Sequence, residues 1–441
     1  MNFDDTVYRT RRERVYDAIG NGMATLFAAP ERMRSNDTEY PYRQDSYFYY
    51  LSGFTEPEAV MILDGANRTS TLCCRPKDPD METWVGFRYG PDLAAQVFGF
   101  DAACNISEWQ QRLQQHLSHA ESIYALWQHD GVADSDIISI WRKLCADVAY
   151  RKIDGNIITP AQILGDLAPI LDEMRLIKDA HEIALLRTAG QLSAEAHNKA
   201  MQAACKGVTE YQLEAEILYH FTRNTARSPA YNSIVAAGKN ACTLHYVQNN
   251  AVLQDGQLVL IDAGAEYGCY AGDITRTFPV NGRFTGAQKA VYEIVLEANK
   301  QAIAAIAPNV LWQEVSDVAL KVLVTGLVDL KLLHGNVEDN IAMQAYRRFY
   351  MHGIGHWIGL DVHDVGGRFY QGQPRLMLEN MCTTVEPGLY INAADDIPPE
   401  FHNIGIRIED NVRVTATAAE VYTNATPKEI EDIEALMREN R

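Results

Sequence analysis

The stretch MHGIGHWIGLDVHD, residues 351–364, is the most informative part of this chain. It places His356 among three glycines, which let the backbone approach a crowded site. Two further histidines, His352 and His363, flank it. A histidine in a glycine-rich loop is usually unremarkable on its own, so its meaning depends on the segments that accompany it.

Four other short segments carry an acidic residue in an apolar or glycine-rich context. They read LVLIDAG (258–264), AGDITRTFP (271–279), VEPGLY (385–390) and GIRIEDNV (405–412), and their candidates are Asp262, Asp273, Glu386 and Glu409. Four carboxylates and one imidazole suit a pair of hard divalent cations better than a single structural zinc. If the five side chains converge, the chain is a two-metal hydrolase.

The spacing around the two aspartates predicts a hairpin. The continuous apolar run LVLI is typical of a buried strand that delivers Asp262 at its end. Asp273 follows eleven residues later, beyond the turn-forming sequence AEYGCYAG. A hairpin here would bring the two carboxylates side by side, where like charges repel unless a cation lies between them. In DITRTF the period of two places Asp273, Thr275 and Thr277 on one face.

The same alternation separates the residues around Glu409. Ile406 and Ile408 face one way, whereas Arg407 and Glu409 face the other. A guanidinium beside a ligating carboxylate is a sensible supporting partner. Each candidate alone is more often a turn residue or part of a solvated strand face. Their joint occurrence in apolar contexts within one domain favours a metal site.

Bulk properties restrict the class of protein. The 441 residues exceed one ordinary core, so two domains are expected. The net charge of −19 argues against a nucleic-acid partner. Eight cysteines without a CxxC pair indicate reduced thiols, and the start of the chain has no signal-like apolar run. No stretch reaches the roughly 18 apolar residues of a membrane helix. We therefore expect a cytoplasmic protein with no membrane partner.

Local patterns divide the chain near residue 172. Residues 1–172 read as a mixed α/β domain, with strands expected at 23–29, 58–65 and 69–76 and a helix at 108–120. Residues 173–441 read as amphipathic helices between strands that end in acidic residues.

Two helix starts in the second half carry capping signals. Thr285 and Gln288 have the spacing of a capping box for a helix over 285–306. Near the end of the chain, Thr426, Pro427 and Glu429 predict that the last helix starts at Pro427.

The motifs resemble those of a known family. The histidine-rich segment 352–364 resembles the signature of proline-specific peptidases of the prolidase and aminopeptidase P type. The order Asp, Asp, His, Glu, Glu is similar to the ligand order of the wider pita-bread metallopeptidases, which include methionine aminopeptidase. Residues 35–60 look like part of the amino-terminal domain of bacterial Xaa-Pro aminopeptidases. This resemblance covers essentially the whole chain and lacks no ligand.

The resemblance implies a fold and a metal assignment. The fold would be two-domain α/β, with the mixed α/β N-terminal domain followed by a creatinase-like or methionine aminopeptidase-like pita-bread α+β domain. Asp262 would bind one metal, and His356 and Glu386 the other. Asp273 and Glu409 would bridge both metals. Two divalent ions per subunit are implied, with manganese expected and zinc or cobalt as alternatives.

The resemblance also implies roles for other side chains. His245, His352 and His363 match additional active-site histidines of the family. Tyr390 and Arg407 match residues that support the ligands. Trp84 matches an aromatic that reaches a neighbouring subunit's site in tetrameric relatives, so a homo-oligomer, dimer or tetramer, is expected.

The activity implied is hydrolysis of the bond between an N-terminal residue and a following proline. A hydroxide that bridges the metals would attack the carbonyl carbon, with Glu386 as general base. His352 or His363 would stabilise the oxyanion, and His245 could act on the leaving-group side. The partners would be peptides with proline at the second position. Two alternatives stay open: a prolidase, which cleaves only dipeptides, and a non-catalytic binding protein on the pita-bread fold.

Overall fold

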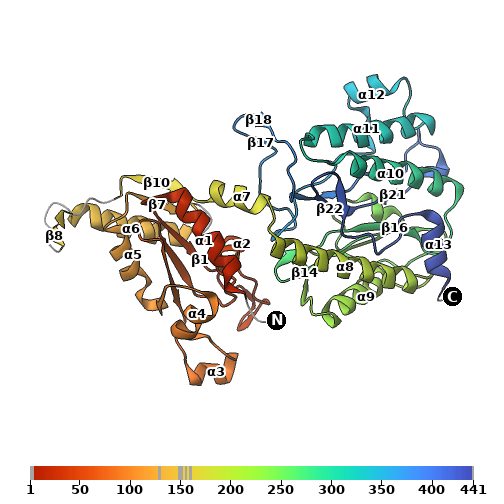
Figure 1. Cartoon of the computed structure of the whole chain (residues 1–441). Helices are drawn as coiled ribbons and strands as arrows, with labels where there is room; N and C mark the ends of the chain where they lie inside the picture. Colours follow the sequence, from red (N-terminus) through yellow and green to blue (C-terminus); the bar gives the residue numbers. More distant parts are fainter. Residues whose placement is uncertain (1–3, 128–130, 148–151, 154–155, 158–160, 440–441) are drawn as a thin grey trace. The chain divides into compact units, whose positions relative to one another are not determined.

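The computed structural model describes residues 4–127, 131–147, 152–153, 156–157 and 161–439 (Figure 1). Its contacts divide the chain into two compact units, residues 1–174 and 175–441. The domain limits expected from the sequence, 1–172 and 173–441, stay a prediction, since compactness alone does not define independently folding domains. Within the described ranges, the helices are all too short or too polar to span a bilayer.

The N-terminal unit is built on one mixed sheet. Its strands are β1 (Met23–Phe27), β4 (Val60–Asp64), β5 (Thr69–Cys74), β6 (Ala102–Asn105), β7 (Ser122–Ala125) and β10 (Ile163–Asp166). They lie in the order β10-β7-β1-β4-β5-β6, and β1 pairs antiparallel with β4 but parallel with β7. The strands expected at 23–29, 58–65 and 69–76 are thus confirmed as β1, β4 and β5.

Helices and two short strand pairs complete this unit. The helices are α1 (Asp5–Ile19), α2 (Ser46–Ser52), α3 (Pro79–Val85), α4 (Gly90–Phe98), α5 (Trp109–Leu117), α6 (Gly131–Asp147) and α7 (Ala168–Leu176), the last of which runs two residues past the division. The strand pairs are β2 (Met33–Ser35) with β3 (Thr38–Glu39), and β8 (Lys152–Ile153) with β9 (Asn156–Ile157). Leu113 of α5 and Ile140 of α6 share an apolar core with Met23 of β1. The helix expected at 108–120 is therefore α5.

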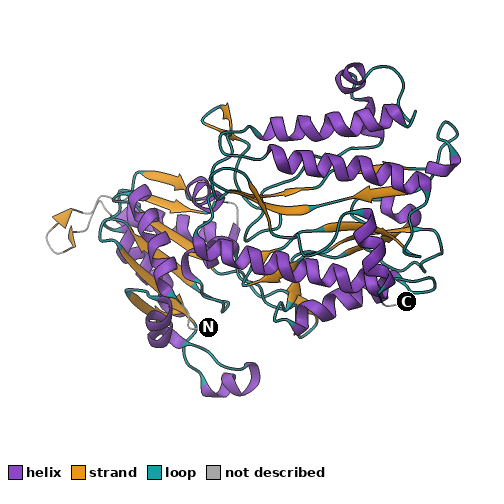
Figure 2. Ribbon diagram, turned by 45° about the vertical axis from the view of Figure 1, so that its right-hand side comes forward, coloured by secondary structure: helices purple, strands orange, loops and turns teal. Residues whose placement is uncertain are grey.

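The C-terminal unit places strands between pairs of helices. Its helices are α8 (Ala180–Ala203), α9 (Glu210–Arg223), α10 (Gly286–Ala305), α11 (Trp312–Asp329), α12 (Val337–Ala342) and α13 (Ile430–Arg438). In Figure 1, α10 and α11 lie together on one side of the strands, and α8 and α9 lie together on the other. Figure 2 shows the same arrangement, with helices on both sides of the strands. Ala200 of α8, Val295 of α10 and the strand residue Ile261 belong to one apolar core that joins these layers.

The strands of this unit form small antiparallel groups. The strands are β11 (Ser228–Pro229), β12 (Ile234–Ala237), β13 (Leu258–Asp262), β14 (Ala265–Tyr267), β15 (Tyr270–Ala271), β16 (Thr275–Pro279), β17 (Phe369–Tyr370), β18 (Gln373–Pro374), β19 (Cys382–Val385), β20 (Gly388–Ile391), β21 (Ile404–Arg407), β22 (Asp410–Val414) and β23 (Ala419–Val421). The groups run β12-β13-β16, β11-β14-β15, β19-β22-β23, β20-β21 and β17-β18. Three of the candidate metal ligands, Asp262, Glu386 and Glu409, lie at or just after the ends of strands β13, β19 and β21.

Short 3-10 turns connect some of these elements. They are η1 (Ile106–Glu108), η2 (Gly238–Cys242), η3 (Ala345–Arg348) and η4 (Pro399–Phe401).

One predicted helix start is confirmed and one is wrong. Thr285 and Gln288 form the expected capping box at the start of α10. The last helix, α13, begins at Ile430 instead of Pro427, and its N-cap Glu429 makes no side-chain capping bond. The carbonyl of Pro427 accepts from Arg276 Nε at 3.2 Å. The carbonyl of Lys428 accepts from the Tyr292 hydroxyl at 2.9 Å, so tertiary hydrogen bonds occupy the groups that an earlier helix would use.

Candidate metal centre

The two aspartates lie close together because of a hairpin. β13 pairs antiparallel with β16, with Asp262 opposite Thr275, and the inner pair β14–β15 closes the turn. A Cβ atom built on Gly264 would lie 1.7 Å from the carbonyl oxygen of Gly272, so only glycine permits this approach. The hairpin predicted from the sequence is confirmed. It places Asp262 at the end of β13 and Asp273 just before β16.

The other three donors come from later segments and meet the aspartates in one cavity. Glu386 lies between β19 and β20, Glu409 lies between β21 and β22, and His356 precedes β19 in the glycine-rich loop. All five donors line a cavity of ≈ 620 Å³. Among the described residues, Asp273, His356 and Glu409 offer ligand atoms that all lie within 4.8 Å of one another.

His356 presents one ring nitrogen to the carboxylates. Its Nδ1 lies 3.0 Å from the carbonyl oxygen of Trp357, which can only accept, so Nδ1 carries the proton and donates. Nε2 is left facing Oδ2 of Asp273 at 3.3 Å and Oε1 of Glu386 at 3.6 Å. Such a hydrogen bond from the second nitrogen to a carbonyl is the usual arrangement of a metal-binding histidine.

The electrostatics of the carboxylates favour binding of a cation. Burial, followed by the charges of Asp273 and its neighbours, raises the pKa of Glu409 well above its ordinary value. Burial also raises the pKa of Asp273, and it raises the pKa of Glu386 to about 7. Burial alone would lower the pKa of His356, but Asp273 and Glu386 raise it to about 9.

For the carboxylates, burial is the first cause of these pKa shifts and mutual repulsion adds to it. A cation among the four carboxylates, of which Asp273 and Glu409 are buried, would stabilise their charged forms. The donor set, mostly carboxylate oxygens with one imidazole, fits divalent metal ions.

Arg407 supports the site through three contacts. Its Nη2 donates to Oδ2 of Asp262 at 2.5 Å and its Nε donates to Oγ1 of Thr275 at 3.0 Å. Its Nη1 donates to the hydroxyl of Tyr390 at 2.9 Å. Thr275 in turn donates to Oε2 of Glu409 at 2.7 Å. Arg407 and Glu409 thus face the site, while Ile406 and Ile408 belong to the apolar core, as the strand alternation predicts.

The chain of contacts continues to His352. Its Nδ1 donates to the carbonyl of Gly353 at 2.8 Å, so its Nε2 accepts from the Tyr390 hydroxyl at 2.9 Å. Both ring nitrogens of His352 are therefore engaged. His363 also lines the cavity, with its ring centroid 4.1 Å from that of His356, and within the described chain no hydrogen bond engages its ring nitrogens.

The two remaining predicted residues have different positions. His245, in the segment between η2 and β13, lines the same cavity as the donors. Trp84 belongs to the N-terminal unit, where it lies in α3 with 85% of its surface exposed.

Tyr231 and Arg368 are among the cavity side chains that sequence reasoning missed. The hydroxyl oxygen of Tyr231 lies 2.5 Å from Oδ1 of Asp262 and 2.5 Å from Oδ1 of Asp273. Burial, followed by these two charges, raises the pKa of Tyr231 well above its ordinary value. The second is Arg368, which also lines the cavity. Tyr231 has no motif of its own, whereas Arg368 follows a glycine pair in the loop after His363.

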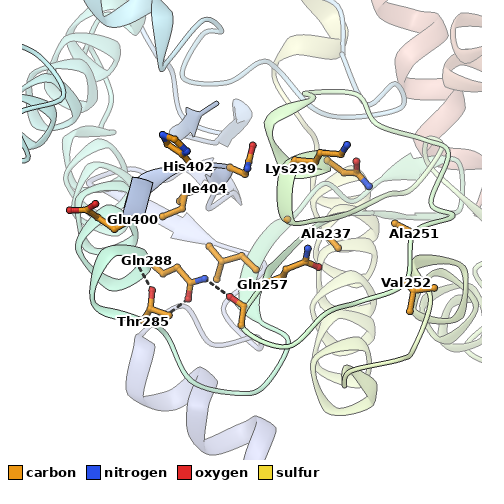
Figure 3. A pocket seen from close by; sticks show the side chains of 15 residues that line it. Ala237, Lys239, Ala251, Val252, Gln257, Thr285, Gln288, Glu400, His402 and Ile404 are labelled. Carbon is orange, nitrogen blue, oxygen red and sulfur yellow. Dashed lines mark hydrogen bonds between the residues drawn. The ribbon is translucent and has the colours of Figure 1, made fainter. Parts of the chain in front are cut away.

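A second cavity of the same unit lacks this chemistry. It measures ≈ 520 Å³ and is lined by polar and apolar residues that include Lys239, Gln257 and Glu400 (Figure 3). Gln288 there donates to the carbonyl of Gly256 at 2.8 Å. A single carboxylate among the lining residues makes it a poor candidate for a metal centre.

Comparison with known families decides the class of protein. The model of metallopeptidase family M24 matches residues 184–416, and the model of the aminopeptidase P N-terminal domain matches residues 8–124. The chain belongs to the aminopeptidase P group of family M24. The M24 match includes all five candidate donors, and the second match lies within the N-terminal unit. The expected two-domain α/β fold with a pita-bread domain is therefore confirmed.

Individual relatives in this group are similar over nearly their whole length. The chain is 45% identical to Xaa-Pro aminopeptidase of Escherichia coli, over 98% of this chain and 97% of that protein. It is 44% identical to Xaa-Pro aminopeptidase of Haemophilus influenzae, over 98% of this chain and 96% of that protein.

Solved structures of the group agree with the fold. A variant of E. coli aminopeptidase P in complex with substrate has a TM-score of 0.95 at 42% identity, with both chains covered completely. Proline aminopeptidase P II from Yersinia pestis has a TM-score of 0.94 at 46% identity, covering 99% of this chain and 100% of that one.

Proposed function

We propose that this chain is a metallo-aminopeptidase that hydrolyses the bond between an N-terminal residue and a following proline. The observation that carries the proposal is the convergence of the five donors in one cavity. The relatives named Xaa-Pro aminopeptidase, at 44% and 45% identity over 98% of this chain, support the choice of substrate.

The donors are proposed to hold two divalent ions, with manganese expected. Asp262 would serve one ion, His356 and Glu386 the other, and Asp273 and Glu409 both. The central position of Asp273, between Tyr231 on one side and His356 on the other, supports a bridging role. When bound, such ions polarise the scissile carbonyl and lower the pKa of the attacking water toward neutrality.

Glu386 is proposed to take the proton from the attacking water. Its carboxylate lies in the cavity 3.6 Å from His356 Nε2, at the edge of the donor cluster. A carboxylate in this position can pass the proton on to the proline nitrogen as the bond breaks. That nitrogen carries no hydrogen in the peptide, so the site needs no acceptor for an N–H group at the scissile bond.

The hydrogen bonds favour His363 over His352 as the donor to the developing oxyanion. Both ring nitrogens of His352 are engaged, by Gly353 and Tyr390. His363 lies in the same cavity beside His356 and can donate without giving up such a partner. His352 is then a positioning group, and His245 is proposed to act on the leaving-group side.

One experiment separates the proposed aminopeptidase function from its two alternatives, a prolidase and a non-catalytic binding protein. The protein is treated with a chelator, then given manganese, and assayed with an Xaa-Pro-Yaa tripeptide and with an Xaa-Pro dipeptide. We expect metal-dependent cleavage of the tripeptide, and cleavage of the dipeptide alone would indicate a prolidase. A protein that binds no divalent metal would be a non-catalytic member of the fold. The matched control is Glu386→Gln, and full activity of that variant would exclude Glu386 as the base.

The remaining proposals concern the setting of the enzyme. We place it in the cytoplasm as a homo-oligomer, dimer or tetramer, in which Trp84 reaches the site of a neighbouring subunit. The high exposure of Trp84 supports this, since an indole with 85% of its surface exposed is free to enter an interface. Neither nucleic acid nor a membrane is proposed as a partner.

A further inference from the structure

The donor cavity contains two guanidinium groups with different surroundings. Arg407 is buried, and its three nitrogens donate to Asp262, Thr275 and Tyr390. Arg368 is an exposed residue at the wall of the same cavity. Because Arg407 is already committed to the protein, Arg368 is the guanidinium that a ligand can reach.

Arg368 is held in place by contacts that leave part of its guanidinium unused. Its Nη2 donates to the carbonyl of Gly355 at 2.8 Å, and its guanidinium carbon lies 4.7 Å from the centre of the Trp312 ring. A Cβ atom built on Gly353 would lie 3.9 Å from the same Nη2, so the group lies against the loop between His352 and His356. Among the described residues, neither Nε nor Nη1 of Arg368 has a hydrogen-bond acceptor.

The backbone that carries Arg368 is also fixed. Arg368 immediately precedes β17 of the β17–β18 hairpin. Arg375 closes the base of that hairpin, since its backbone nitrogen donates to the carbonyl of Arg368 at 2.8 Å and its Nε donates to the carbonyl of Gly367 at 2.6 Å. A guanidinium on a closed hairpin base, stacked on an indole, loses little freedom when it binds a ligand.

The charges of the cavity would bind the two ends of a short peptide at different places. The four carboxylates gather at the metal centre, whereas the free donors of Arg368 lie at the wall. A guanidinium binds a carboxylate through two parallel charge-assisted hydrogen bonds. We propose that Arg368 binds the C-terminal carboxylate of short peptides and so makes this chain prefer substrates that end soon after the proline. This inference rests on the function proposed above and names its substrate class.

The test compares free acids with amides of the same peptide. Wild-type protein with manganese is assayed on an Xaa-Pro-Yaa tripeptide with a free carboxylate and on its C-terminal amide. We expect kcat/KM to be at least about tenfold higher for the acid, mainly through a lower KM, because one charge-assisted hydrogen-bonded pair is lost with the amide. Arg368→Gln should remove this preference, and Arg368→Lys should restore part of it. Equal kcat/KM for acid and amide in the wild type would overturn the inference.

A matched variant separates ligand binding from a structural role. Arg375→Gln changes an arginine of the same hairpin base that does not line the cavity. It should keep the acid-to-amide ratio of the wild type, and equal loss of the ratio in both variants would refute a direct contact by Arg368. The Kd of the product Pro-Yaa, measured by calorimetry as acid and amide, should change in parallel with KM.

Failure of the inference and failure of the proposed function give different results. Cleavage of both tripeptides at equal rates leaves the aminopeptidase function intact and rejects the role of Arg368. Absence of cleavage of either peptide by the metal-loaded wild type rejects both. Thermal unfolding of each variant identifies any loss of folding. If Arg368→Gln does not fold, the calorimetric Kd of the folded Arg368→Lys variant decides whether Arg368 binds the carboxylate.

Discussion

The hydroxyl oxygen of Tyr231 lies 2.5 Å from Oδ1 of Asp262. The same hydroxyl reaches Asp273 at an equal distance, yet it has a single proton and can donate to only one carboxylate at a time. Tyr231 therefore lies between the two aspartates as a shared hydrogen-bond partner and adds no positive charge there. A supporting group of this kind commonly changes metal affinity by about 10–100-fold.

The first prediction concerns Tyr231→Phe. We expect the affinity for manganese to fall by about tenfold, because the aspartates lose their common hydrogen-bond partner. Calorimetric titration of metal-free protein measures this directly. The matched control is Tyr246→Phe, which removes a hydroxyl that donates to Glu210 at 2.9 Å outside the cavity. Equal binding isotherms for wild type and Tyr231→Phe would contradict the prediction.

The second prediction concerns metal removal. Chelation should lower the melting temperature, and manganese at about 100 times its Kd should restore about 2.7 kcal/mol of stability by linkage. In Glu409→Gln the rise in melting temperature on addition of manganese should be smaller than in the wild type. The melting temperature of the metal-free variant should exceed that of the metal-free wild type, since the pKa of Glu409 is raised well above its ordinary value by burial and by neighbouring carboxylates. A melting temperature that changes with neither chelator nor added metal would exclude a metal centre here.

The third prediction separates the two histidines. His363→Ala should lower kcat by about 100-fold with little change in KM, because it removes the proposed donor to the oxyanion. Tyr390→Phe removes the group that engages Nε2 of His352 and should have a smaller effect. Steady-state kinetics of both variants test the order. A larger loss of kcat in Tyr390→Phe than in His363→Ala would contradict the prediction, and His352→Ala would then show whether the loss acts through His352 or through Arg407, the other partner of the Tyr390 hydroxyl.

The fourth prediction concerns the pH dependence of stability. Burial alone would raise the pKa of Asp364, but Lys178 and Arg175 hold it below the ordinary value of 3.8. Nζ of Lys178 lies 2.7 Å and Nη2 of Arg175 2.5 Å from its oxygens. A carboxylate with a lowered folded pKa stabilises the protein above its unfolded pKa, and this contribution is lost as pH falls through the folded pKa.

Asp364→Asn should therefore lose about 3–5 kcal/mol near neutral pH, because it removes the carboxylate that pairs with the buried cations of Lys178 and Arg175. The difference from wild type should shrink once the pH is below 3.8. Chemical unfolding across this pH range measures both effects. The control is Asp396→Asn, which breaks an exposed pair with Arg348 and should change stability by less than about 1 kcal/mol. A difference that grows in acid would have the wrong sign.

The parts of the site that could be predicted from the sequence depend on strand periodicity and on turns. The hairpin that carries Asp262 and Asp273 follows from an apolar run, a turn and the spacing between them. The opposite faces of Ile406 and Arg407 follow from the period of two. Such patterns are local, so a single sequence contains them.

The parts that could not be predicted depend on contacts between distant segments. Tyr231 meets the aspartates only because the backbone after β11 passes beside them, which no local pattern encodes. The predicted start of the last helix was wrong because Arg276 and Tyr292, which are distant in the sequence, donate hydrogen bonds to the carbonyls of Pro427 and Lys428. The position of Arg368 could not be predicted for the same reason, because it depends on contacts with Trp312 and Gly355.

The order of the donors along the chain has a consequence for biosynthesis. Asp262 and Asp273 leave the ribosome first, and Glu409 follows Asp262 by about 150 residues, or roughly 7–30 s at ordinary synthesis rates. Until His356 and Glu386 follow, the nascent chain holds only the two aspartates, which would bind a cation weakly. We therefore expect metal to bind late, after the fold is complete, and the choice between manganese and zinc to depend on the ions that the finished protein meets.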